Sequence, residues 1–69
     1  MEKRVAEELM QEILKLSSQI NVIAEKIEAG TSGEELAVMR RHVAAMMAAS
    51  DEHLFRPLLR QYPELEPHW

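Results

Sequence analysis

AEELMQEILKLSSQINVIAEKI, residues 6–27, repeats its apolar side chains every seven residues. The apolar positions follow one another at alternating steps of three and four: Ala6, Leu9, Ile13, Leu16, Ile20, Ile23 and Ile27. This spacing places one narrow apolar seam along an α-helix and is typical of coiled coils and helical bundles. Met10, Ser17 and Ala24 border the seam and widen it toward the face that a bundle needs. The helix therefore needs a partner helix to cover it.

The limits of this first helix are set by residue types that favour or stop helices. No Gly or Pro interrupts Glu2–Ala29, and Glu, Leu, Lys and Ala are frequent in it. We expect Gly30 to end the helix by adopting the left-handed conformation. Ser32 and Glu35 have the spacing of a capping box, which predicts the start of a second helix near Gly33.

The second helix repeats the apolar spacing of the first. Its apolar or small positions are Leu36, Met39, Val43, Met46 and Ser50. A short link between two long helices forces them antiparallel, so the chain is predicted to be a helical hairpin. Residues 43–49 are apolar or small all the way round the helix. We expect them at the centre of an oligomer interface, buried on more than one side.

Three prolines shape the end of the chain. Pro57 predicts that the second helix kinks or ends over residues 51–56, and that a short last helix runs from Pro57 to Tyr62. Pro63 and Pro67 predict an extended tail over residues 63–69, outside a hairpin of residues 1–62. Counting from the turn places Leu54 and Leu58 near Leu9 and Val5, and these residues would close the open end of the hairpin.

The composition favours self-association. Chains as short as these 69 residues bury little apolar surface and gain stability from disulfides, metals or oligomerisation. Because the chain has no cysteine, disulfides and thiolate zinc sites are excluded. We therefore expect an all-α hairpin that dimerises into a four-helix bundle. The predicted oligomer interface consists of Leu9, Ile13, Leu16, Ile20, Ile23, Ile27, Leu36, Met39, Val43, Met46, Met47 and Leu54.

Charge and hydropathy disfavour two classes of partner. The net charge of -4 argues against general binding to nucleic acids or anionic membranes, which use an excess of Lys and Arg. The longest runs without Asp, Glu, Lys or Arg, residues 16–24 and 42–50, are far shorter than the roughly 20 residues that span a bilayer. Residues 1–5 have no apolar secretory core. We expect a cytoplasmic protein without a membrane partner.

No residue pattern predicts catalysis, a cofactor or a metal site. Metal sites in helical bundles use Glu-x-x-His pairs, whereas Met39 and Ser50 stand three positions before His42 and His53. The four serines fit structural roles as caps and small polar spacers, and two packed helices offer little concavity that would exclude water. We therefore expect a protein that is not an enzyme.

The favoured function is binding to another protein, as a small oligomeric adaptor, antagonist or regulatory subunit. Methionine-rich helix surfaces adapt to partner helices, and an amphipathic helix in a groove is a common mode of recognition. The tail residues Tyr62, Leu65 and Trp69 are candidate partner contacts. For Tyr62 and Leu65 we favour packing onto the bundle, whereas both alternatives stay open for Trp69.

A basic stripe supports an alternative function. Arg4, Lys15 and Lys26 recur every eleven residues and so fall on nearly the same side of the first helix. In helix number, length and heptad pattern over residues 5–55, the chain resembles the Rop family of plasmid-copy-number proteins, acidic hairpins that dimerise and bind paired RNA loops. No residue motif of that family is matched, so no RNA-binding residue is carried over. The resemblance implies a dimeric RNA- or DNA-binding regulator, whose binding would weaken with salt and be lost in Lys15→Glu.

Overall fold

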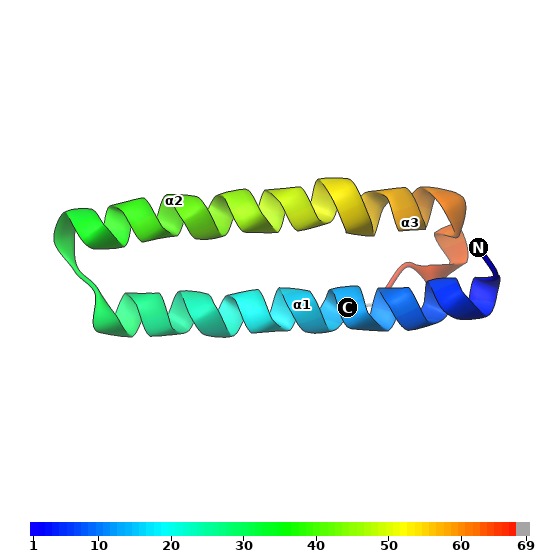
Figure 1. Ribbon diagram of the computed structural model, residues 1–69, viewed down its shortest axis with the longest axis horizontal. Coiled ribbons are helices and arrows are strands. Elements are labelled where there is room, and N and C mark those ends of the chain that lie inside the picture. The colour runs from blue at the N-terminus through cyan, green and yellow to red at the C-terminus, as the bar shows by residue number, and fades with distance from the viewer. Residues whose placement is uncertain (68–69) are drawn as a thin grey trace.

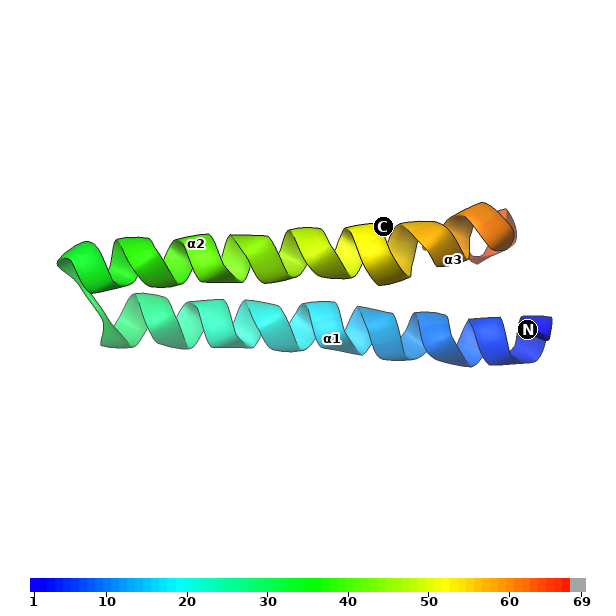
Figure 2. The ribbon, with the colours of Figure 1, turned by 45° about the horizontal axis from the view of Figure 1, so that its top comes forward.

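Two long antiparallel helices form the molecule. The computed structural model describes residues 1–67. Its elements in chain order are α1 (Lys3–Gly30), α2 (Gly33–Ser50), the π-helical turn η1 (Asp51–Phe55), α3 (Arg56–Gln61) and the 3₁₀ turn η2 (Pro63–Leu65). Figures 1 and 2 show α2 and α3 in one line beside α1, with the connecting turn at the left. The prediction of an all-helical hairpin is confirmed, and residues 1–67 contain no strand.

The core lies between α1 and the opposing α2–α3 line. Its buried residues are Ala6, Met10, Ile13, Ile20, Ile27 and Leu58. Leu9, Leu16 and Ile23, which belong to the same predicted seam, stay 38–40% exposed. A single neighbouring helix covers only one side of the seam. The hairpin therefore buries the heptad position of Ile13 and Ile20 and leaves the position of Leu9 and Leu16 partly exposed.

The turn between the helices differs from the prediction in two respects. Gly30 is the last residue of α1, and Gly33 is the residue with left-handed backbone, at φ 61°. Ser32 occupies the N-cap position of α2 but its side chain makes no capping hydrogen bond, so the predicted capping box is wrong. The C-terminus of α1 is closed by Thr31, whose backbone N–H and Oγ1 both donate to the carbonyl of Ile27, at 3.0 and 2.7 Å.

Substitutions in this turn test whether Thr31 or Ser32 caps a helix. Thr31→Val is expected to destabilise the chain by about 1 kcal/mol, because it leaves the half-buried carbonyl of Ile27 with one donor fewer. Ser32→Ala removes a hydroxyl that makes no capping bond and is expected to change stability by less than about 0.5 kcal/mol. Urea denaturation followed by circular dichroism measures both. A larger loss in Ser32→Ala would show that the capping box forms in solution.

The predicted irregularity before Pro57 is a π-helical turn. The backbone N–H of Arg56 donates to the carbonyl of Asp51, five residues back, and the helix continues into α3 instead of ending. The Nε atom of Arg56 also lies 2.6 Å from Oδ2 of Asp51. The last helix was predicted over Pro57–Tyr62 and runs over Arg56–Gln61.

The segment after α3 turns back across the open end of the hairpin, toward α1 (Figure 1). Pro63–Leu65 form a 3₁₀ turn, so the prediction of a wholly extended tail is wrong there. Tyr62 and Leu65 pack against the core cluster around Ala6, as favoured from the sequence. The hydroxyl of Tyr62 donates to the carbonyl of Met1. His68 and Trp69 lie outside the described residues.

An ion pair also links this segment to α1. Nζ of Lys3 lies 3.7 Å from Oε1 of Glu64, and both side chains are about half exposed. Exposed pairs of this kind stabilise by less than about 1 kcal/mol. The packing of Tyr62 and Leu65 therefore contributes more than the ion pair to holding the tail.

Candidate protein-docking face

One side of the hairpin carries large apolar side chains that are left partly exposed within residues 1–67. We call it the apolar face, and each member is between 36% and 46% exposed. Its residues are Leu9, Leu16 and Ile23 from α1, Met39 and Met46 from α2, and Leu54 from η1. All six belong to the predicted oligomer interface. The other six predicted residues lie between the helices: Ile13, Ile20 and Ile27 are buried, and Leu36, Val43 and Met47 are half-buried.

Contacts between the helices show that the two halves of the apolar face lie on the same side. Glu28 follows the buried Ile27 on α1 and forms two hydrogen bonds with Arg40 of α2, each 2.6 Å long. These bonds mark one side of the hairpin. Met39 precedes Arg40 by one residue and falls on the opposite flank of α2.

The opposite flank of α1 carries the leucines of the apolar face. Leu9 stands four residues before the buried Ile13, just as Leu16 stands four before Ile20. Leu9 and Leu54 line one hollow, which joins the two halves of the face directly. The apolar face therefore runs along both helical lines.

The π-helical turn keeps this face in register. On α1, successive residues of the apolar face are seven residues apart. On the opposing line, Met46 follows Met39 by seven residues, but Leu54 follows Met46 by eight. The inward-facing residues show the same extra residue. They follow one another at steps of three or four, except for the step of five from Ser50 to Phe55, and they are Val43, Met47, Ser50, Phe55 and Leu58. A regular α-helix would bring His53 to the face in place of Leu54. The turn Asp51–Phe55 absorbs the additional residue.

A hollow of about 200 Å³ opens at the end of the apolar face away from the turn. We call it the open-end hollow. It is lined by Met1, Leu9, Ile13, His53, Leu54, Pro57, Leu58 and Gln61. The sequence predicts that Leu9 lies near Leu54, but it does not predict the contributions of Met1, Pro57 and Gln61. Of these, only Pro57 could have been found by counting, because it precedes Leu58 on the inward line.

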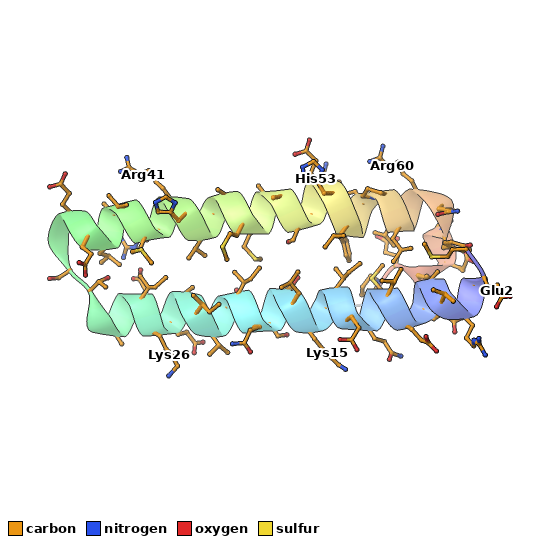
Figure 3. All side chains as sticks on the ribbon, in the orientation of Figure 1. Glu2, Lys15, Lys26, Arg41, His53 and Arg60 are labelled. Atoms are coloured by element: carbon orange, nitrogen blue, oxygen red, sulfur yellow. The ribbon has the colours of Figure 1, made fainter. Side chains whose placement is uncertain are left out.

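The predicted basic residues lie on the far side of α1 from α2. Lys15 and Lys26 point away from the hairpin in Figure 3, and Arg4 falls in line with them by helical periodicity. Nζ of Lys15 is 3.1 Å from Oε1 of Glu12, so its charge is partly compensated. Arg41, His53 and Arg60 point outward from the opposite edge of the molecule (Figure 3). The structure thus separates the basic residues onto two edges.

One ion pair shifts the pKa values of its members. The hydrogen bonds from Arg40 lower the pKa of the Glu28 carboxyl, and the same contacts raise the pKa of the Arg40 guanidinium. Because the pKa of Glu28 is lowered in the folded chain, the stability that this pair contributes is present above the ordinary pKa of Glu and is lost as the pH falls through the lowered value. Both side chains are solvent-exposed, so the pair marks the turn end of the hairpin without dominating its stability.

The described residues offer no other built site. No group of three or more His, Asp or Glu side chains in residues 1–67 is arranged to hold a metal ion. The hydroxyl of Ser50 donates to the carbonyl of Met47 at 3.0 Å, which is a structural role. None of the helices in this part of the chain combines the length and the apolar character needed to cross a bilayer. The apolar face is the feature with the clearest capacity to bind.

Comparison of the chain with protein-family models, with curated proteins and with solved structures gave no significant match.

Proposed function

We propose that this chain is a non-catalytic protein-binding module that acts through its apolar face, and that the face is first covered by a second copy of the chain. Two hairpins joined in this way form a four-helix bundle. The proposal is supported above all by the six large apolar side chains that share one side of the hairpin. Contiguous exposed apolar side chains on a small protein mark interaction surfaces.

The surface of the single chain also supports the proposal. Its accessible surface is 5316 Å², whereas a compact monomer of 8.0 kDa exposes about 4450 Å². Its radius of gyration is 14.6 Å, against about 11 Å for a compact domain of this length. The excess surface, roughly 900 Å², is close to the roughly 800 Å² that each partner buries in a stable interface of ordinary size.

A dimer of this kind leaves other surfaces free for a further protein. Ala44, Ala45, Ala48 and Ala49 are exposed on α2, so the single chain does not bury this segment on more than one side. Its predicted place at the centre of an oligomer interface stays a prediction. With the apolar face covered, this segment and the outer edges of the helices would be available to the protein that the module regulates or joins.

Mass in solution tests the proposal. Light scattering after size exclusion, at two protein concentrations, is expected to give about twice the chain mass of 8.0 kDa. A cooperative thermal transition whose midpoint rises with protein concentration is expected as well, because association stabilises the folded state by mass action. A monomer with a cooperative transition that does not depend on concentration would contradict the proposal.

A further inference from the structure

The open end of the apolar face is hollowed, whereas the hollow described at the turn end lies on the other side of the hairpin. At the open end, the open-end hollow of about 200 Å³ lies between Leu9 and Leu54. At the turn end, Ile23 and Met39 stand on the face, 38% and 36% exposed. A smaller hollow at this end holds about 80 Å³ and is lined in part by Glu28 and Arg40, which mark the other side of the hairpin. The hollow on the apolar face therefore lies at its open end, away from Ile23 and Met39.

We infer that, in the proposed dimer, the second copy is placed with its turn at the opposite end, so that Met39 of each copy enters the open-end hollow of the other. This arrangement rests on the proposed function, since it requires that a second copy covers the apolar face. The two-fold axis then crosses the long axis of the hairpin at a right angle, near Leu16 and Met46.

Residue counting supports this arrangement. Leu9 and Ile23 each lie seven residues from Leu16, which is about 10 Å along α1. On the opposing line, Met39 lies seven residues and Leu54 eight residues from Met46. A two-fold axis through the middle therefore brings the turn end of each copy over the open end of the other.

The shape of Met39 suits the hollow. Methionine is unbranched and flexible, and fills irregular apolar gaps well. With the turns at opposite ends, Met39 of one copy lies over Leu54 and Pro57 of the other, which line the hollow. Ile23 then lies over Leu9. Each open-end hollow is filled by side chains that are otherwise exposed to water.

The reverse arrangement, with both turns at the same end, loses this fit. It places one hollow of about 200 Å³ against the other and brings Ile23 of each copy over Met39 of the other at the turn end. Atoms that line an unfilled hollow lose their packing partners, which interfaces of native density avoid. The unequal ends of the face thus favour opposite turns.

The distance between the two turns tests the arrangement. Because the chain has no cysteine, Ser32→Cys provides a single site for a nitroxide label, and Ser32 makes no capping hydrogen bond that the change would remove. With opposite turns, the distance between labels measured by pulsed electron paramagnetic resonance is expected to approach the 46 Å length of the molecule. With both turns at one end it would be roughly 20 Å, since facing helices lie only about 8–10 Å apart.

A disulfide provides a second readout. Within one chain, Met39 and Leu54 are fifteen residues apart along nearly continuous helix, about 22 Å, and cannot form a disulfide. The double variant Met39→Cys/Leu54→Cys is expected to yield a covalent dimer on mild oxidation. The two single variants are the matched controls, since each places its two cysteines at opposite ends of the bundle and is expected to stay uncrosslinked.

The outcomes separate this inference from the proposed function. A dimer with a short label distance, or a double variant that crosslinks no more than the single variants, overturns the arrangement and leaves the proposed function standing. A chain that stays monomeric gives no intermolecular distance and overturns both. A long distance together with the covalent dimer supports both.

Discussion

Replacement of Ile20 by aspartate is expected to abolish the fold. Ile20 is 3% exposed and lies midway along the core between the helices. A carboxylate there loses its water and finds no cationic partner, a penalty of several kcal/mol. A chain of 69 residues has a total stability of only about 3–10 kcal/mol. Circular dichroism of Ile20→Asp at neutral pH is therefore expected to show an unfolded chain.

Val22→Asp is the matched control for this prediction. Val22 lies two residues away on the same helix and is 41% exposed, so the same new charge stays in water. Its loss of stability is expected to stay within about 1 kcal/mol. If Ile20→Asp kept the helicity of Val22→Asp, the assignment of the core would be wrong.

Leu16→Asp is expected to separate the proposed dimer. Leu16 is 40% exposed and lies in the middle of the apolar face, so a dimer would bury two new carboxylates close to its two-fold axis. Their desolvation and repulsion are expected to weaken association by about 3 kcal/mol, or roughly 100-fold in Kd. Light scattering is expected to show a mass that falls toward 8.0 kDa at concentrations where the unchanged chain is dimeric.

The control is again Val22→Asp, because its exposure of 41% matches that of Leu16 and it lies off the apolar face. Both variants add the same charge to the same helix, so a general effect of charge would appear in both. Equal dissociation constants for the two variants would exclude the apolar face as the interface. A loss of helicity on dissociation would show that folding and association are coupled, as they are in many small dimers.

The heptad spacing of the first helix and the short link after it were sufficient to predict the hairpin, because steps of three and four indicate an α-helix with an opposing partner and the link makes that partner antiparallel. They could not predict which half of the seam faces inward. Leu9 and Ile13 occupy equivalent positions in such a pattern, and both are large and apolar. The division depends on the side from which α2 packs against α1, and the heptad spacing does not specify that side.

Local features were predicted less well where a backbone N–H or carbonyl group had more than one possible hydrogen-bond partner. Ser32 has the right residue type and spacing for a capping box, but its side chain makes no capping hydrogen bond. Instead, the hydroxyl of Thr31 donates to the carbonyl of Ile27 at the end of the preceding helix. Pro57 correctly indicated an irregular helix, since it lacks a backbone N–H. A single proline is compatible with a kink, a break or a wider turn, and only the five-residue hydrogen bond from Arg56 to Asp51 distinguishes these.

The π-helical turn has a further consequence for how such a chain can change during evolution. Loss of the single codon for Glu52 would bring Leu54 to seven residues after Met46 and restore an unbroken heptad on that side of the molecule. Phe55 and Leu58 would keep their inward positions as well. The line formed by α2, η1 and α3 could therefore be one residue shorter without substitutions before or after the turn. A one-residue deletion between Met46 and Leu54 would therefore leave the core and the apolar face in place, whereas a deletion in the middle of α1 would rotate part of the core toward water.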